Sequence, residues 1–347
     1  LVFLGVRLVF AAALTGLIGL IELLGWGPAA GIIGTIPHSK SSAYALSVLP
    51  MFIFIGFLAF HAGMTQQLFD AARKWVGWVP GGLAVATVFA TAGFAAVSGA
   101  STATSAVFAR VAIPDMLKYG YDKKLAAGVV AAGGTLATLI PPSAILVIYA
   151  IIVEESVGRL LLAGFLPGLV SALIYAGIIV LWALRHPDSA PSVGGFTMKE
   201  RLKTIPGVMP IALVVVIIIS AIYGGWATPT EAGALGVGVV FLLALSRGTG
   251  FKTIKEALME SAKLTAMIFS LIWGVLIFVR FLGFSGLPEA FTSWILSLDA
   301  EPMVIMICIL IAYAILGMFM DAIGMLLLTL PVVYPAVIAL GFDSIWF

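Results

Sequence analysis

The segment Thr135-Leu136-Ala137-Thr138-Leu139-Ile140-Pro141-Pro142-Ser143 interrupts an apolar run over residues 124–150. Its two prolines remove two backbone donors and clash with the preceding turn, so we expect the helix to break here and to leave carbonyl groups near residues 137 and 138 without helical partners. A run of this length crosses the ~30 Å hydrocarbon core of a bilayer. Unwound backbone at that depth is tolerated only where it lines a polar cavity or is buried in protein. The segment therefore predicts a broken membrane span, with a proline kink satisfied by neighbouring helices as the alternative.

The whole chain has the composition of a membrane protein. Of its 347 residues, 62% are hydrophobic and 10% are charged, and the mean hydropathy is +1.19. A soluble domain carries about a quarter charged residues, so this chain cannot cover itself with polar surface. Besides 124–150, we expect membrane spans at about 3–24, 44–63, 160–184, 207–226, 229–247 and 264–283. The predicted fold class is an all-α polytopic membrane protein embedded in a lipid bilayer, and the net charge of +2 argues against a nucleic-acid partner.

The lysine and arginine residues predict how the chain is oriented in the bilayer, because basic residues stay on the cytoplasmic side. With the N-terminus inside, the inner segments collect 14 of the 18 lysine and arginine residues, whereas Lys40 and Arg159 fall outside. Arg110 and Arg280 lie within or at the ends of apolar segments. The opposite orientation inverts this count. We therefore expect a multi-pass protein with a cytoplasmic N-terminus.

Two further apolar stretches fit this orientation only if each enters and leaves the bilayer on the same side. Residues 80–118 are broken at Ser98-Gly99-Ala100-Ser101-Thr102, and cytoplasmic charges flank both ends. Residues 301–340 are broken around Gly317-Met318-Phe319-Met320-Asp321 and, by the same counting, enter from outside. We expect two re-entrant hairpins, an inner one at 80–118 and an outer one at 301–340. A pair of full spans with a short turn at the far surface is the alternative for the first stretch, but its small polar tip favours the hairpin.

A weak internal repeat relates the two halves of the chain. Proline, glycine, an aromatic residue and aspartate keep their spacing in residues 114–122 and 335–343. Because the charge count places the first set inside and the second outside, we expect inverted repeats, which are typical of secondary transporters. Residues 1–185 then form the first repeat, residues 186–206 a cytoplasmic linker, and residues 207–347 a second repeat that is C-terminally incomplete.

The tip of the inner hairpin is rich in hydroxyl groups. Ser98, Ser101, Thr102 and Thr104 surround Gly99, which permits a close backbone approach. The second arm starts here, and its free N–H groups and positive dipole end favour an anion such as a carboxylate. The oxygen atoms of this tip and of the broken span also suit a hard cation such as sodium. A turn in which Ser98 caps the second arm is the alternative.

Isolated charges within apolar segments are further candidates. Asp321 in the outer hairpin costs on the order of 2.5–3.5 kcal/mol at the bilayer centre, so we expect it to face a cavity or an ion. A shallower hairpin in which Asp321 caps a helix is the alternative. Arg110 and Arg280 are candidates to attract a carboxylate, although each could instead snorkel to the interface. We interpret Thr228-Pro229-Thr230-Glu231 as a capping box that begins a helix. No Ser–His–acid set, nucleotide loop or Cys/His cluster occurs in the sequence, so we do not predict an enzyme.

A series of short motifs runs through the chain in a distinctive order. The motifs are Ser98-Gly99-Ala100-Ser101, Ile113-Pro114-x-Met116, Gly120-Tyr121, Ala132-Gly133-Gly134, Ile140-Pro141-Pro142-Ser143, Ser156-Val157-Gly158, Ala163-Gly164, Pro167-Gly168, Thr228-Pro229-Thr230-Glu231-Ala232 and Leu316-Gly317-Met318-Phe319-x-Asp321. In order and spacing they resemble the large membrane subunit of tripartite ATP-independent periplasmic (TRAP) transporters, over essentially the whole chain. The chain departs from that family at Thr138, where glycine is more usual, and at Arg110. The second proline-pair segment of the family would follow Phe347.

The resemblance implies an elevator-type transporter in a bacterial inner membrane, with a transport domain made of the two hairpins and two broken spans. It also implies sodium-coupled uptake of an organic acid with no organic cofactor, a small four-helix membrane subunit and a periplasmic substrate-binding protein. The positions that match the family's motifs, together with the oxygen-rich tip and break, predict that sodium binds at Ser98, Gly99, Ser101, Thr135, Thr138, Pro141, Gly317 and Asp321. The same positions predict that the substrate binds at Ser98, Thr102 and Ser143. Arg110 and Arg280 are added because their positive charge attracts a carboxylate.

Two other functions stay open on the sequence alone. The first is a stand-alone secondary carboxylate or anion transporter of the same superfamily, which needs no binding protein. The second is a membrane scaffold or channel without coupled transport.

Overall fold

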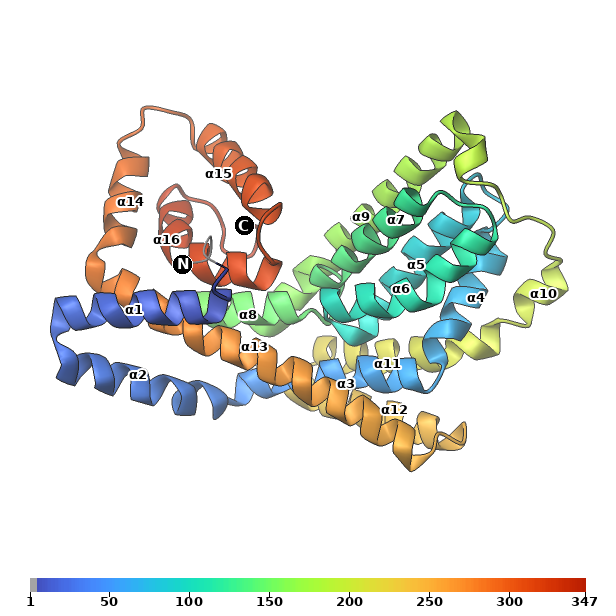
Figure 1. The fold of residues 1–347 in the computed structure, drawn as a ribbon, viewed down its shortest axis with the longest axis horizontal. Coiled ribbons are helices and arrows are strands. Elements are labelled where there is room, and N and C mark those ends of the chain that lie inside the picture. The colour runs from blue at the N-terminus through green and yellow to red at the C-terminus, as the bar shows by residue number, and fades with distance from the viewer. Residues whose placement is uncertain (1–4) are drawn as a thin grey trace. The chain divides into compact units, whose positions relative to one another are not determined.

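The computed structural model describes residues 5–347, and every regular element within this range is helical. Figure 1 shows the helices in chain order. They are α1 (Leu8–Leu24), α2 (Trp26–Ser41), α3 (Val48–His61), α4 (Met64–Val76), α5 (Gly82–Ser98), α6 (Ser101–Lys118), α7 (Lys123–Thr135), α8 (Ala144–Val153), α9 (Val157–Arg185), α10 (Met198–Leu202), α11 (Ile205–Tyr223), α12 (Pro229–Ser246), α13 (Phe251–Ser285), α14 (Leu287–Leu296), α15 (Pro302–Gly317) and α16 (Ala322–Ala339).

Five helices in the described range are long and apolar enough to cross a membrane, namely α9, α11, α12, α13 and α16. The pair α3 and α4, bent by 71°, is a sixth candidate. The prediction of an all-α polytopic membrane protein is therefore confirmed. The predicted spans at 160–184, 207–226 and 229–247 correspond to α9, α11 and α12. The span predicted at 3–24 corresponds to the 17-residue α1, and its residues 3 and 4 lie outside the described range.

Helix boundaries differ from the predicted spans in three places. α13 begins at Phe251 rather than at 264, because the polar stretch before residue 264 is helical even though it lowers the local hydropathy. The sequence argument does not predict α2, whose glycine, proline, histidine and lysine residues dilute its apolar character. The segment 44–63 starts with a 3₁₀ turn at Tyr44–Ser47, and only then does α3 begin. Runs of high hydropathy mark only the apolar helices, so a prediction based on them misses helices of mixed composition.

Contacts divide the chain into two units. Residues 5–46, 148–156 and 264–347 belong to the first unit, and residues 47–147 and 157–263 belong to the second. In the first unit, α14 packs along α16. Ile295 of α14, Met306 of α15 and Val337 of α16 belong to one buried hydrophobic cluster.

In the second unit, α5 is the central helix and contacts α4, α6, α7 and α9 (Figure 1). Its sequence consists mostly of alanine, glycine, threonine and valine. Such small side chains let neighbouring helices approach closely. At one of these contacts a Cβ atom on Gly133 of α7 would lie 3.1 Å from the Thr91 methyl group and closer still to the hydroxyl. The small residues of α5 thus bring the inner hairpin and the broken span together.

The ends of α6 and α16 share one hydrogen-bonding pattern. Each helix is followed by a glycine with positive φ, Gly120 at 82° and Gly341 at 89°. Two residues later, Asp122 or Asp343 accepts hydrogen bonds of 2.8 to 3.1 Å from the backbone N–H groups two and three positions further on. The two copies of the sequence pattern thus form the same local turn, while the internal repeat itself stays a prediction. The opposite orientation of the two copies, and the division into repeats at residues 185 and 206, stay predictions.

The linker over residues 186–206 is attached to the start of α5 through Tyr121. The Tyr121 hydroxyl donates a hydrogen bond to the Pro191 carbonyl at 2.6 Å and accepts one from the Leu83 N–H group at 3.1 Å. Burial raises the pKa of this hydroxyl above its usual value, so it keeps the proton that it donates. The Val193 N–H group adds a bond of 3.0 Å to the Gly77 carbonyl.

Candidate substrate and ion site

The tip of the α5–α6 hairpin is a two-residue connection. α5 ends at Ser98 and α6 begins at Ser101, so the predicted break is confirmed. Gly99 has φ +60° and ψ 4°, a left-handed conformation that costs little only for glycine. Ala100 is extended and occupies the N-cap position of α6, where no side chain accepts a hydrogen bond from the first turn. The alternative in which Ser98 caps α6 is therefore wrong, and the N–H groups of this turn are not used by a capping side chain.

Ser98 instead bonds to a hydroxyl on the other arm. Its side chain is buried, and its Oγ lies 2.9 Å from Thr104 Oγ1. Thr104 Oγ1 in turn donates to the Ala100 carbonyl at 2.9 Å. Because a threonine hydroxyl has only one proton, Ser98 is the donor to Thr104 and keeps its lone pairs. Ser101 is half-buried and Thr102 is exposed at the start of α6.

The proline-rich segment breaks the span as the sequence predicts. α7 ends at Thr135, a 3₁₀ turn covers Leu136–Thr138, and α8 begins only at Ala144. The Ser143 hydroxyl donates to the Thr138 carbonyl at 2.7 Å and so occupies one of the carbonyl groups that the prolines release. Ser143 is fully buried, whereas Thr138 is half-buried.

The two threonines of the break also bond locally. The Thr138 hydroxyl donates to the Thr135 carbonyl at 2.7 Å, and the Thr135 hydroxyl donates to the Ala132 carbonyl at 2.6 Å. Tyr175 of α9 brings its hydroxyl within 3.1 Å of Thr135 Oγ1. Sequence reasoning missed Tyr175, because no local pattern marks an aromatic side chain that meets a residue 40 positions away.

The hairpin tip and the break are in contact. The Ala144 N–H group donates to the Gly99 carbonyl at 2.9 Å. A Cβ atom on Gly99 would overlap the Pro142 carbonyl oxygen, so only glycine permits this approach. Ser98, Gly99, Ser101 and Thr102 thus lie at the same place in the second unit as the break that contains Thr138, Pro141 and Ser143. The result is a cluster of hydroxyl and carbonyl oxygens at two helix interruptions.

The outer hairpin is broken where the sequence predicts, and its residues belong to the first unit. α15 ends at Gly317, and α16 begins at Ala322. Asp321 is the N-cap residue of α16, and its carboxylate accepts a hydrogen bond from the Ile323 N–H group at 3.1 Å. Gly317 and Asp321 are both exposed. The capping geometry that the sequence left open as an alternative is therefore present, while a role for Asp321 toward sodium stays a prediction.

Arg280 lines a cavity of about 590 Å³ in the first unit. The cavity is bounded by α2, α8, α13 and α16, and half of its lining residues are isoleucine or leucine. Lys40 and Glu154 are the other charged residues in its lining. Glu154 has φ +60°, an uncommon conformation for a residue with a side chain that often marks a functional site. Arg110 lies in the second unit instead, exposed on α6.

The interpretation of Thr228-Pro229-Thr230-Glu231 as a structural motif is confirmed. Thr228 Oγ1 accepts a hydrogen bond from the Glu231 N–H group at 3.3 Å, and the Glu231 carboxylate accepts one from the Thr228 N–H group at 2.7 Å. Pro229 occupies the first helical position of α12. The start of a helix therefore accounts for Thr228, Pro229 and Glu231.

Comparison with known proteins gives one consistent family. The family model described as "Tripartite ATP-independent periplasmic transporter, DctM component" matches residues 1–347. The C4-dicarboxylate TRAP transporter large permease protein DctM of Pseudomonas aeruginosa is 34% identical over 307 residues, which cover 88% of this chain and 71% of that protein. The sialic acid TRAP transporter large permease protein SiaM of Vibrio cholerae is 30% identical, covering 88% of this chain and 71% of the relative.

A third relative is matched over a smaller share of its own length. The isethionate TRAP transporter permease protein DctMQ of Oleidesulfovibrio alaskensis is 28% identical, over 91% of this chain and 50% of that protein. These matches confirm the family resemblance that the motifs indicate. The chain belongs to the DctM component family of TRAP transporters and is a multi-pass membrane transport permease rather than an enzyme.

Proposed function

We propose that this chain carries out sodium-coupled uptake of an organic acid across the inner membrane of a bacterium. The observation that carries the proposal is the contact between the α5–α6 tip and the break between α7 and α8 in a TRAP permease. Discontinuous helices that meet inside a membrane transporter offer backbone oxygens to a cation and helix N-termini to an anion. Both kinds of helix end come together here, because α5 ends and α6 begins within the same contact.

Sodium ions bind to oxygen atoms at the two interruptions. In the second unit the ligands come from Ser98, Gly99 and Ser101 of the tip and from Thr135, Thr138 and Pro141 of the break. The lone pairs that Ser98 Oγ keeps while donating to Thr104 support this assignment. The negative dipole end of α5 at Ser98 also favours a cation. In the first unit, Gly317 and Asp321 supply oxygens for a second ion, with the Asp321 carboxylate already fixed by its bond to the backbone.

The substrate carboxylate binds next to the sodium oxygens, at the N-terminus of α6. Ala100 offers no capping side chain, so the N–H groups of the first turn and the positive dipole end favour an anion. Thr102 contributes a hydroxyl group, and Ser98 and Ser143 contribute theirs when they turn from Thr104 and the Thr138 carbonyl to the carboxylate. Arg110 on α6 attracts the carboxylate over a longer range, and Arg280 adds positive charge to the cavity of the first unit. Two relatives are named as transporters of C4-dicarboxylate and of sialic acid, which supports an organic acid as the substrate.

The transport movement is of the elevator kind. The inner hairpin and the outer hairpin are re-entrant, and with the broken spans they form the domain that moves substrate and sodium together. The distribution of basic residues supports a cytoplasmic N-terminus. A small four-helix membrane subunit and a periplasmic binding protein complete the transporter, and the DctMQ name of one relative supports an association of two membrane components.

Uptake of a radiolabelled dicarboxylate into proteoliposomes tests this function. The full-length large subunit is reconstituted with its small subunit, and a sodium gradient is imposed with and without purified binding protein. We expect saturable uptake that requires both the sodium gradient and the binding protein. Sodium-driven uptake without binding protein would support the stand-alone carboxylate transporter instead. Passive flux that follows only the substrate gradient would identify a channel and overturn the proposal.

A further inference from the structure

α4 has the features of a helix that lies at a membrane interface. It is bent by 71° from the apolar α3. One face buries Leu68 and Phe69, while the opposite face exposes Gln66. At its end, Trp75 and Trp78 are 41% and 62% exposed. Leu68 and Phe69 pack inside the protein, whereas the two exposed tryptophans are of the residue type that is enriched at the level of lipid headgroups.

Two pockets of opposite character adjoin between α4 and α11. The polar pocket, of about 450 Å³, is lined by Gln66, Gln67, Asp70, Lys74, Lys203 and Thr204. The apolar pocket, of about 300 Å³, is lined by residues that include Leu68, Trp75, Phe89, Ile205, Met209 and Ala212. Thr204 belongs to both pockets. Together they form one groove, the α4–α11 groove, with a charged end and an apolar end.

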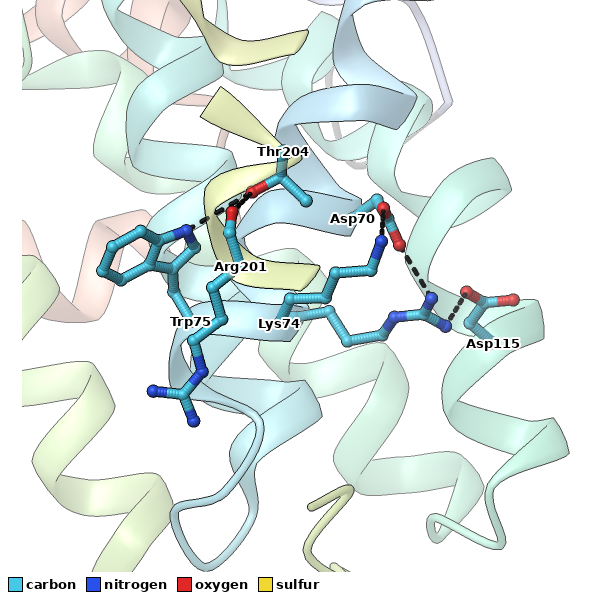
Figure 2. A network of polar contacts seen from close by, with 7 residues as sticks. Asp70, Lys74, Trp75, Asp115, Arg201 and Thr204 are labelled. Atoms are coloured by element: carbon cyan, nitrogen blue, oxygen red, sulfur yellow. Dashed lines mark hydrogen bonds and ion pairs between the residues drawn. The ribbon is translucent and has the colours of Figure 1, made fainter. Parts of the chain in front are cut away.

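Hydrogen bonds fix the wall at the junction of the two pockets. Figure 2 shows Thr204 between Trp75 and Arg201. The buried Thr204 hydroxyl donates to the Arg201 carbonyl at 2.6 Å and accepts a hydrogen bond from Trp75 Nε1 at 3.3 Å. The Trp75 indole is thus held where the groove changes from polar to apolar. Ile205 and Met209, on the next turns of α11, remain 41% and 56% exposed.

The charge around the polar pocket is positive. Asp70 is neutralised by Lys74 at 2.8 Å and by Arg73 at 2.7 Å, and Arg73 also lies 3.7 Å from Asp115 (Figure 2). Lys199, Arg201 and Lys203 form no ion pair within 4 Å in the described part of the chain. The nearby Glu200 carboxylate already accepts hydrogen bonds from Thr197, which lower its pKa and keep it ionised. Of the charged residues that line the polar pocket, Lys74 is paired with Asp70, whereas Lys203 forms no ion pair within 4 Å among the described residues and supplies the positive charge at this end of the groove.

We propose that the α4–α11 groove binds one anionic phospholipid. Its phosphate lies beside Lys203 and Lys74, and an acyl chain occupies the apolar pocket along Trp75 and Met209. A small soluble anion would match only the charged end and leave the apolar end unfilled. Basic pockets beside membrane helices on the cytoplasmic side attract anionic headgroups by about 1 kcal/mol per lysine or arginine, or about five-fold in affinity. The groove combines that charge with an interfacial helix and a place for a chain.

Native mass spectrometry of the delipidated complex of large and small subunits tests this proposal. Phosphatidylglycerol, phosphatidylcholine with the same acyl chains, and glycerol phosphate are each added in turn. We expect phosphatidylglycerol to bind at least about five-fold more tightly than phosphatidylcholine, because its headgroup carries the net negative charge that the lysines attract. Glycerol phosphate should not bind measurably, because it has no acyl chain to bury.

Two substitutions separate the two ends of the groove, each with a matched control. Lys203→Gln should weaken phosphatidylglycerol binding about five-fold. Ala212→Trp, at an exposed position, should fill the apolar pocket and prevent binding of both phospholipids. Lys252→Gln on α13 and Val216→Trp on the exposed face of α11 do not line the groove and should leave binding unchanged.

Three results would overturn the proposal. Equal binding of phosphatidylglycerol and phosphatidylcholine would remove the charge argument. Binding that neither Lys203→Gln nor Ala212→Trp alters would place the lipid elsewhere. Lipid binding that appears only when the small subunit is left out would identify that subunit as the occupant of the groove.

Discussion

The Ala144 N–H group donates a hydrogen bond of 2.9 Å to the Gly99 carbonyl, which joins the first turn of α8 to the tip of the α5–α6 hairpin. Residues 45 positions apart thus hold two helix interruptions against each other. Because both interruptions expose oxygen atoms, any change that separates them should affect ion binding more than folding of the surrounding helices.

Gly99→Ala is predicted to disturb this contact. The new side chain meets the Pro142 carbonyl oxygen, and an alanine at φ +60° adds roughly 1–2 kcal/mol of strain. We expect lower thermal stability of the purified complex and a rise of about tenfold in the sodium concentration for half-maximal uptake, because about 1.4 kcal/mol of binding free energy is tenfold in affinity. Gly128→Ala on α7 is the control, since a Cβ atom there meets nothing within 4 Å. Equal effects of the two substitutions would contradict the argument.

Ser98→Ala is predicted to weaken sodium activation. Removing an oxygen that contacts a charged group costs about 1.5–3 kcal/mol, so the sodium concentration for half-maximal uptake should rise by about tenfold or more. Thr138→Ala should act in the same direction. Ser246→Ala is the control, because that hydroxyl donates only to the Leu243 carbonyl at the end of α12. Sodium curves that coincide with the wild-type curve for both Ser98→Ala and Thr138→Ala would remove these residues from the site.

Two substitutions of Asp321 separate a cap from an ion ligand. Asparagine caps a helix about as well as aspartate, whereas alanine costs about 1 kcal/mol. Asp321→Asn should therefore keep the thermal stability of the complex but raise the sodium concentration needed for uptake. Asp321→Ala should lower both stability and sodium affinity. If Asp321→Asn leaves the sodium dependence unchanged, the carboxylate serves only to cap α16.

Arg280→Gln is predicted to raise the KM for a dicarboxylate. The side chain lines the 590 Å³ cavity with Lys40, so its removal lowers the positive potential that attracts the anion. We expect KM to rise about five-fold at low salt, a coupling of about 1 kcal/mol, and the difference to shrink at high salt as screening increases. Arg185→Gln, at the exposed end of α9, removes the same charge away from the cavity and should leave KM unchanged. A KM that is insensitive to Arg280→Gln at every salt concentration would exclude this role.

The interruptions were the most predictable part of the fold. Gly99 and the Pro141-Pro142 pair act locally, because each changes which backbone conformations or donors are available. The sequence therefore predicts the breaks close to where the structure has them. The capping box at Thr228 is local in the same sense. By contrast, α2 and the polar start of α13 were missed, because apolar length says little about helices of mixed composition.

The features that the sequence did not predict depend on contacts between residues far apart in the chain. The bond of Tyr175 to Thr135, the attachment of Tyr121 to the linker and the presence of Lys40 and Glu154 beside Arg280 depend on how helices pack. No spacing in the sequence encodes such meetings. The Asp321 cap was left open for a different reason. An aspartate at this position of the sequence is compatible both with capping a helix and with binding an ion. The sodium role of the site residues and the inverted orientation of the repeats stay predictions.

The attachment of the linker through Tyr121 also decides where a reporter domain can be inserted. A fluorescent protein placed near Pro191 would displace the carbonyl that the Tyr121 hydroxyl holds and pull on the start of α5. Between Gly194 and Gly195 the backbone is exposed, and added atoms there meet nothing within 4 Å. That junction follows the Val193 bond to Gly77 and precedes the Thr197 capping box of α10, so both anchors stay intact. A fluorescent protein inserted between Gly194 and Gly195 would therefore report the location of the permease in living cells while the hydrogen bonds that attach the linker to the start of α5 are kept.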